Sequence, residues 1–150
     1  MSSQHNKPLL KLEAFLPYKL AVLSNQVSSN FAQIYKDKFA LSITEWRIMA
    51  ILGEYPGTSA DEVSSRTKIE KSIISRSVAK LLQRHFIARE FAQQDKRRSI
   101  LHLTELGRSV YEDVVPTSYE LEEQLKACFS EEECHTFNQL IDKLYQHSQK

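Results

Sequence analysis

Apolar residues recur every three or four positions along most of this chain, which is the spacing of amphipathic helices. The first such stretch predicts a long helix that starts near Pro17, suited to a first helical turn, and ends near Lys38. The apolar segment LLKLEAF before it is expected to form a separate arm. A second helix, capped by Thr44, is expected to stop at Pro56-Gly57.

Two closely spaced helices are expected next. Ser59, with Glu62 three residues later, has the pattern of a capping box and starts a short helix to about Arg66. A brief turn then leads into a helix from about Glu70 to Arg84. Its buried stripe is predicted to be Ile74, Val78, Leu81 and Leu82. A short helix, a tight turn and a longer helix form a helix-turn-helix.

The pattern then changes to short strands at 86–91 and 98–103, joined by a basic segment. Thr104 is expected to cap a further helix that bends at Pro116. Ser130 begins a second capping box and a last helix, in which apolar residues repeat at helical spacing: Phe137, Leu140, Ile141 and Leu144. The predicted order is therefore helices, a helix-turn-helix, a β-hairpin and helices again.

Composition narrows the class of protein. With 150 residues, 41% hydrophobic and 26% charged, the chain is predicted to be one globular domain. No secretory signal or membrane span is recognisable, so a cytoplasmic protein is expected. Cys128 and Cys134 are too few for a disulfide framework, and the His/Cys spacing fits no metal site, so no cofactor is expected. No nucleophile–base signature or glycine-rich phosphate loop indicates an enzyme.

Charge is unevenly distributed along the chain. Residues 66–98 carry ten Lys/Arg and three Asp/Glu, a net charge of +7. Residues 99–150 carry four Lys/Arg and ten Asp/Glu, a net charge of −6. A cationic middle in a chain of net charge +1 predicts a local anion-binding face.

The second helix of the helix-turn-helix has a small, polar face opposite its apolar stripe. Ser72, Ser75, Ala79 and Gln83 share this face with Arg76, while Lys71, Lys80 and Arg84 flank it. Small residues permit close approach to the major groove, Arg76 could bridge guanine O6 and N7, and the flanking cations could hold phosphates. Taken alone, the face could equally be a solvated helix surface. Its position next to a capped helix and a basic hairpin favours DNA.

The hairpin that follows would act as a wing. Its basic segment holds Asp95, Lys96, Arg97 and Arg98, and an arginine there could enter a narrow A·T-rich minor groove. An aspartate two residues earlier could orient the guanidinium. An exposed turn with incidental charges would explain the residue types but not their position.

These residues resemble a known family. DKRRSILHLTELG is similar to the wing of the MarR family of winged helix-turn-helix regulators, and LSITEWRIMAIL and EKSIISRSVAKLL resemble its second and recognition helices. The resemblance runs from about residue 16 to 145 and implies a mainly α fold. A winged helix-turn-helix lobe would span about 40–103, with dimerisation helices at about 9–38 and 104–147. It departs at His85, where members commonly have glycine.

The resemblance also implies roles. Arg97 would be the minor-groove residue, Asp95 its orienting partner and Arg76 the main cation of the recognition helix. Members act as homodimers on pseudo-palindromic operators in double-stranded DNA, and the apolar terminal helices here also suggest an interface. Many members respond to small aromatic or phenolic anions, for which four residues could form a site: Tyr18, Lys19, Trp46 and Tyr111. For Trp46 and Tyr111, however, a place in the core is the more common outcome.

The sequence therefore predicts a dimeric transcriptional regulator, a repressor released by a small ligand. Two alternatives remain at this point: a winged-helix module that acts through protein partners, and a regulator without ligand control. Cysteine-based sensing is not expected, because the family's sensing cysteine lies in the N-terminal helix, where this chain has none.

Overall fold

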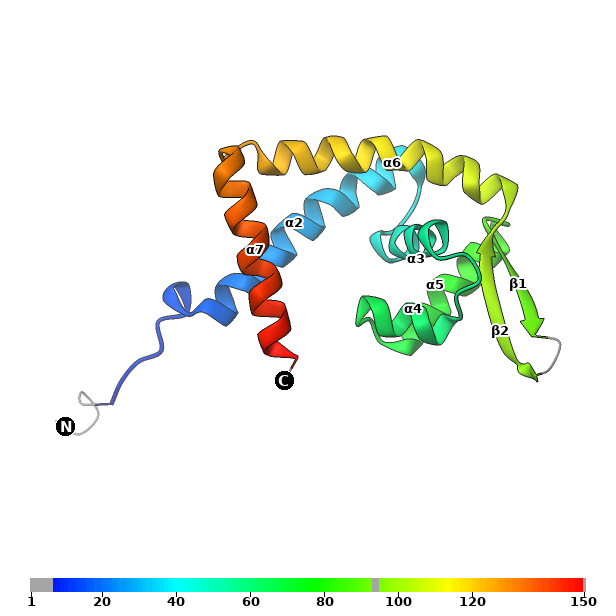
Figure 1. The fold of residues 1–150 in the computed structure, drawn as a ribbon, viewed down its shortest axis with the longest axis horizontal. Coiled ribbons are helices and arrows are strands. Elements are labelled where there is room, and N and C mark those ends of the chain that lie inside the picture. The colour runs from blue at the N-terminus through cyan, green and yellow to red at the C-terminus, as the bar shows by residue number, and fades with distance from the viewer. Residues whose placement is uncertain (1–6, 93–94, 150) are drawn as a thin grey trace. The chain divides into compact units, whose positions relative to one another are not determined.

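The computed structural model describes residues 7–92 and 95–149, and for residues 92 and 95–98 it describes the main chain alone. The chain forms two compact units, Met1–Val110 and Tyr111–Lys150. Figure 1 shows the elements of both along the chain. The predicted class, a mainly α fold with a two-stranded hairpin, is confirmed.

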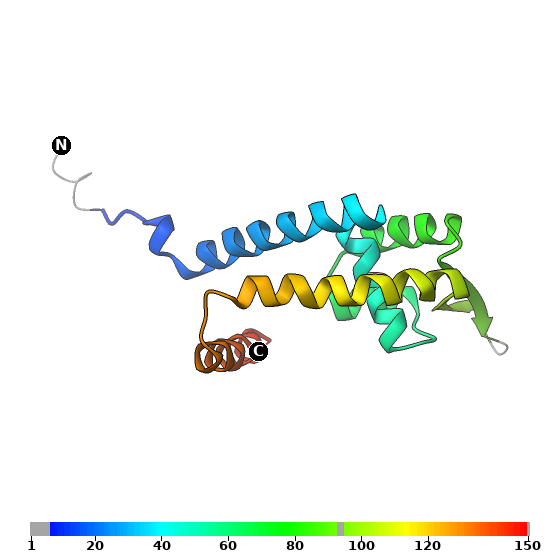
Figure 2. The same ribbon diagram turned by 90° about the horizontal axis from the view of Figure 1, so that it is seen from above.

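The first unit opens with the short 3-10 helix η1 (Leu12–Ala14) and the long helix α2 (Leu16–Phe39). As predicted, Pro17 lies in the first turn of α2, where the missing N–H of proline costs nothing. The helix ends in Ala40, whose φ of 53° reverses the chain and whose N–H donates to the Lys36 carbonyl at 3.0 Å. Figure 2 shows the N-terminal half of α2 extending well beyond the helices of the lobe.

Helix α3 (Ile43–Glu54) starts one residue earlier than predicted, and Thr44 is not its cap. Ser42 takes that place: its Oγ accepts from the Glu45 N–H at 3.0 Å, while Glu45 Oε1 accepts from the Ser42 N–H at 2.8 Å. The prediction missed a capping box, in which the glutamate three residues after the cap satisfies a second main-chain donor.

The helix-turn-helix is present as predicted, with α4 (Ala60–Thr67) and α5 (Lys71–Gln83). Ser59 Oγ accepts from the Glu62 N–H at 3.2 Å and caps α4. Ile74, Val78 and Leu81 are buried as expected, whereas Leu82 is half-buried at the edge of the stripe. The stripe completes a core whose other members include Leu41, Ile48, Met49, Leu52, Val63 and Leu101.

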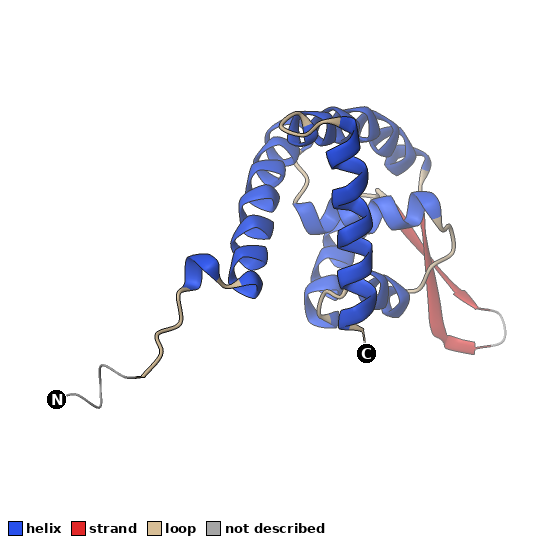
Figure 3. Cartoon of the chain, turned by 60° about the vertical axis from the view of Figure 1, so that its left-hand side comes forward, coloured by secondary structure: helices blue, strands red, loops and turns tan. Residues whose placement is uncertain are grey.

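A two-stranded antiparallel hairpin follows, formed by β1 (Ile87–Ala92) and β2 (Asp95–Leu103) and drawn red in Figure 3. Its base is buried through Ile87, Leu101 and Leu103. The second strand was predicted to begin at Arg98 but begins at Asp95, so the basic segment continues the strand. The pairing shifts between Phe91 and Ala92, which is the irregularity of a β-bulge.

Helix α6 (Glu105–Lys126) starts at the wing and crosses the boundary between the two units. Thr104 is its cap, as predicted: Thr104 Oγ1 accepts from the Gly107 N–H at 3.0 Å. The helix runs through Pro116, which has no N–H to donate to the preceding turn.

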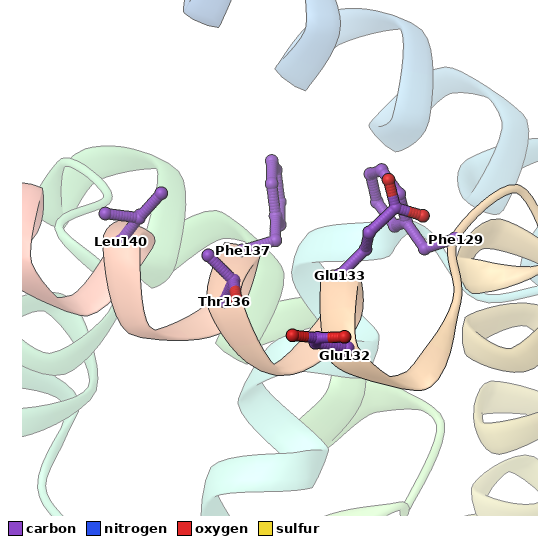
Figure 4. A pocket seen from close by; sticks show the side chains of 6 residues that line it. All are labelled: Phe129, Glu132, Glu133, Thr136, Phe137 and Leu140. Atoms are coloured by element: carbon purple, nitrogen blue, oxygen red, sulfur yellow. The ribbon is translucent and has the colours of Figure 1, made fainter.

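The second unit consists of the remainder of α6 and helix α7 (Glu131–Ser148). The predicted capping box at Ser130 is confirmed, with Glu133 as its partner. At the corner between these helices the rings of Phe129 and Phe137 lie 5.3 Å apart between centroids. They line a shallow hollow with Thr136, Leu140 and two glutamates, and Figure 4 shows both rings projecting to the same side.

Candidate nucleic-acid interface

Helix α5 has a buried inner face and an exposed outer face. The inner face is the buried stripe through Ile74, Val78 and Leu81. Except at Arg84, which is half-buried, the outer face is exposed at all the positions expected to meet DNA: Lys71, Ser72, Ser75, Arg76, Ala79, Lys80 and Gln83. Because the inner face is packed against α3 and α4, the helix presents a fixed row of small side chains with Arg76 among them.

The turn before α5 is held by side chains that the sequence analysis did not single out. Ser64 Oγ donates to the Ile69 carbonyl at 2.6 Å, and Thr67 Oγ1 donates to the Val63 carbonyl at 2.8 Å. Lys68 ends α4 with a φ of 59°. Such local hydrogen bonds satisfy main-chain carbonyl groups that a tight turn would otherwise leave without a donor. They also fix the angle between α4 and α5. The presence of serine and threonine in a short helix before a turn could have indicated these hydrogen bonds from the sequence.

Lys71 and Lys80 flank the outer face and both are exposed. Lys71 Nζ lies 3.7 Å from Asp61 Oδ1, with both side chains largely in solvent. An exposed ion pair of this kind contributes little free energy, so Lys71 remains able to bind another anion.

Arg84 has a different setting from the one predicted for it. Its Nη1 donates to the Ala40 carbonyl at 2.6 Å, and its guanidinium carbon lies 4.4 Å from the centroid of the Phe86 ring. A guanidinium already bonded and stacked within the lobe is poorly placed to hold a phosphate. We therefore assign Arg84 to the lobe rather than to the DNA-contacting set.

The turn from α5 into the wing holds His85 in a left-handed conformation. Arg84 ends the helix, and His85 follows with a φ of 63°. The Phe86 N–H donates to the Leu81 carbonyl and the His85 N–H to the Leu82 carbonyl, each at 3.0 Å. These two bonds form a Schellman motif, whose left-handed residue is usually glycine because a Cβ is strained there. The helix-to-strand turn thus keeps its form with histidine.

Thr104 ties this turn to α6. Its Oγ1 donates to the His85 carbonyl at 2.6 Å, and its N–H donates to the Phe86 carbonyl at 3.1 Å. One turn later Gly107 is buried so closely against Phe86 that a Cβ built on it overlaps the Phe86 carbonyl. The threonine and glycine of the LTELG segment therefore have structural roles at the base of the wing.

The wing residues are described in part. Asp95, Lys96, Arg97 and Arg98 belong to β2, in which Asp95 pairs with Ala92, but their side chains lie outside the described residues. On the neighbouring strand Arg89 is exposed and adds a cation to the wing that was not singled out from the sequence. Glu90 Oε1 lies 4.0 Å from His102 Nε2 on the face that Arg89 does not share.

The four residues predicted to bind a ligand are not brought together within one lobe. Tyr18 and Lys19 are exposed in the first turns of α2. Trp46 is 8% exposed and lies beside Tyr35, with the two rings tilted by 43° and 6.0 Å between their centroids. Tyr18 and Tyr35 are 17 residues apart on one helix, or about 25 Å at 1.5 Å per residue. Trp46 is a core residue, which is the outcome that the sequence indicated as the more common one for it. Tyr111, half-buried, belongs to the second unit.

Among the residues that the structure describes, no three His, Cys, Asp or Glu side chains are grouped to hold a metal ion. Within the same described residues, no helix is long and apolar enough to cross a membrane.

Comparison with known proteins agrees with this geometry. Residues 41–99 match the model of the MarR family. The HTH-type transcriptional regulator BilQ of Clostridium symbiosum is 30% identical over 113 residues, which cover 75% of this chain and 77% of that protein. The structure superposes on a MarR/EmrR family transcriptional regulator from Acinetobacter sp. ADP1 with a TM-score of 0.85 and 28% identity, covering 93% of this chain and 99% of the other.

The fold is also that of MepR from Staphylococcus aureus in its DNA complex, with a TM-score of 0.81 and 19% identity, over 89% of this chain and 98% of that one. The helix-turn-helix and most of the hairpin wing lie within the residues that the family model matches, and the solved structures also cover the long helices on either side. The chain belongs to the MarR family of transcriptional regulators.

Proposed function

We propose that two copies of this chain bind a pseudo-palindromic operator in double-stranded DNA and repress transcription from it. The observation that carries the proposal is the outer face of α5, exposed along its length and fixed from behind by a buried stripe. MepR, which has the same fold, is known in a DNA complex. The protein would act in the cytoplasm, and no catalytic role is proposed.

In this proposal the recognition helix reads bases through a few side chains. Arg76 donates to guanine O6 and N7 in the major groove, and Ser72, Ser75 and Ala79 permit the close approach that this requires. Lys71 and Lys80 bind phosphates beside the groove, where they add affinity without sequence preference.

The wing supplies the second contact. Asp95, Lys96, Arg97 and Arg98 lie in or at the start of β2, and Arg97 enters the minor groove next to the site of α5. Asp95 orients its guanidinium. A net charge of +7 over residues 66–98 supports this assignment, since helix, wing and turn all lie in that segment.

The dimer would bury the apolar surfaces that one copy leaves exposed. The arm and the first half of α2 expose a set of large apolar side chains: Leu9, Leu10, Leu12, Phe15, Leu16, Leu20, Val22 and Leu23. Helix α7 exposes a second set: Phe137, Leu140, Ile141, Leu144 and Tyr145. Apolar surfaces of this extent are typical of interfaces.

Release by a small aromatic or phenolic anion is the finer part of the proposal. Tyr18 and Lys19 would supply an exposed ring and a cation at the proposed interface. The ligand would lower operator affinity by binding the DNA-incompetent conformation more tightly than the competent one.

Substitution of Arg76 tests the central claim. An operator is first selected from random duplexes with the wild-type protein, and Arg76→Ala and Lys80→Ala are then compared on it and on a scrambled duplex. Arg76→Ala should lose about 1–3 kcal/mol per half-site on the operator and little on the scrambled duplex. Lys80→Ala should weaken both and flatten the salt dependence.

Arg108→Ala is the matched control, because Arg108 is an exposed arginine on α6, away from the outer face of α5. Equal losses from Arg76→Ala on every duplex would exclude base readout by this helix. If the wild-type protein selected no duplex at all, a module that acts through protein partners would become the better description.

A further inference from the structure

The side chain of Arg84 joins the C-terminal ends of α2 and α5, two helices to which different roles are assigned. Arg84 is itself the C-cap of α5, where its N–H donates to the Lys80 carbonyl at 3.1 Å. Its side chain reaches Ala40, the residue that ends α2, through the 2.6 Å bond from Nη1 to the Ala40 carbonyl. One residue therefore terminates the recognition helix and holds the end of the long helix.

The acceptor is well suited to a cation. The Ala40 and Leu41 N–H groups close the last turn of α2 by donating to the Lys36 and Tyr35 carbonyls at 3.0 and 3.3 Å. Carbonyl groups at the C-terminal end of a helix carry the negative pole of its dipole, so a guanidinium is favoured there. The left-handed conformation of Ala40 places its carbonyl beyond the helix.

The guanidinium is held from a second side. It stacks over the Phe86 ring, 4.4 Å from the centroid, and Phe86 is buried and follows α5 in the Schellman motif. A planar guanidinium can donate in its plane while its face rests on a ring, whereas a lysine ammonium can make only the point contact. The setting thus selects arginine over lysine.

The two joined helices contact each other chiefly through a third. Helix α2 packs on α3, and α3 packs on α5. Arg84 adds a direct link from α2 to α5 across that layer. Helix α2 bears the exposed apolar surface assigned above to the dimer, and α5 bears the face assigned to DNA.

We propose that Arg84 is a positioning residue that fixes α5 relative to α2 and thereby sets the spacing between operator half-sites that the dimer accepts. This inference rests on the proposed function. In a dimer, the separation of the two recognition helices follows from their attachment to the dimerisation helices, and it must match half-sites one helical turn or a multiple apart. A loosened attachment accepts more spacings.

The test compares spacing profiles. Selected operators are altered by inserting or deleting one base pair between the half-sites, and affinities are measured for wild type, Arg84→Lys and Arg84→Met. For wild type, a changed spacing should greatly lower the affinity for the operator. For both variants, this loss of affinity should be smaller by about fivefold or more, which is the lower end of the couplings between linked sites. Contacts of each half-site with its own α5 should remain.

A phosphate-contacting role predicts a different result. Arg84→Lys would then bind like wild type, Arg84→Met would weaken all operators alike with a smaller salt slope, and the spacing profile would not change. That outcome overturns the proposal. Arg66→Met is the matched control, since Arg66 lies over the Tyr55 ring at 3.9 Å in the same lobe without joining α2 to α5. Its spacing profile should equal that of wild type.

A second measurement does not depend on DNA. Spin labels are placed at the exposed Asn30 of α2 and Ala79 of α5, with Cys128 and Cys134 replaced by serine and labelled chains diluted in unlabelled protein. The distance distribution between the labels should broaden in Arg84→Lys and Arg84→Met but not in Arg66→Met. Broadening, together with a failure of the unlabelled wild-type protein to select any operator, would indicate that the proposed function has failed and the positioning role has not. An unchanged distribution in folded Arg84→Met would refute the positioning role.

Discussion

Gly107, in the first turn of α6, lies against the main chain of Phe86, at the entry to the wing, with no room for a Cβ between them. The two residues are 21 positions apart in the sequence, yet their contact joins the end of the recognition-helix turn to the start of α6. Thr104 bonds to the same segment through the His85 and Phe86 carbonyls. Close approach of two main chains requires glycine on one of them.

Replacement of this glycine should therefore destabilise the lobe. Gly107→Ala forces the Phe86 main chain to move and strains the hydrogen bonds of Thr104, at a cost of about 2–4 kcal/mol. Urea denaturation measures the change in free energy of unfolding. Ser109→Ala, at an exposed position two residues later, should leave stability within about 0.5 kcal/mol. Equal stabilities of the two variants would show that the junction relaxes without cost.

Substitution of His85, the left-handed residue after α5, should have the opposite effect on stability. His85→Gly should stabilise the protein by about 0.5–1 kcal/mol, because glycine adopts a positive φ without the strain that a Cβ brings. Thermal and urea unfolding would record the gain. His85→Ala separates the backbone effect from loss of the imidazole, since alanine keeps the strain and should bring no gain. Stabilisation by both substitutions would instead place the cost in the imidazole.

The wing prediction concerns flanking sequence. Arg97→Ala should weaken binding most on operators with A·T-rich flanks and least where the flanks are G·C-rich, because a narrow minor groove concentrates negative potential. Lys96→Ala should weaken both kinds of operator to a similar degree. Titrations of each variant against both flank types measure this.

Asp95→Ala provides the sharper comparison. If Asp95 orients Arg97, its removal should weaken binding, although simple electrostatics predicts tighter binding when an anion near phosphates is deleted. The two accounts differ in sign, and affinities at two salt concentrations decide between them. Tighter binding than wild type would remove the orienting role.

The dimer prediction uses the exposed face of α7. Leu140 is 57% exposed in one copy, and Leu140→Asp should raise the dimer dissociation constant by about tenfold or more, because a carboxylate would be buried without a partner. Sedimentation velocity over a concentration series measures the shift. Gln139→Asp places the same charge on the preceding, exposed position and should leave the dimer nearly intact. Indistinguishable variants would place the interface elsewhere.

Periodicity and capping signals predicted most of the helices correctly from the sequence. The stripe through Ile74, Val78 and Leu81 lies in the core, and Ser59, Thr104 and Ser130 are caps, because both features depend on neighbours within a few residues. Where two caps competed, at Ser42 and Thr44, the glutamate three residues after Ser42 was the deciding signal that was overlooked. The start of β2 was misplaced because charged residues were taken for a loop, whereas pairing with β1 extends the strand.

Long-range contacts were the part that the sequence did not predict. Arg84 looked like a phosphate contact from its charge and helical position, but its partners, Ala40 and Phe86, are set by tertiary packing. Tyr18 and Trp46 looked like parts of one site because aromatic rings suit such a ligand, yet the length of α2 separates them. The exposure of the outer face of α5 was predicted correctly at most positions because helical spacing alone decides it, while contact of this face with DNA stays a prediction.

A single residue, Thr104, stands between the last residue of β2 and the first of α6, and its hydrogen bonds hold both to the turn after α5. The base of the wing and the first turn of α6 therefore share one anchorage. A change in the conformation of the turn after α5 would be transmitted to both elements together.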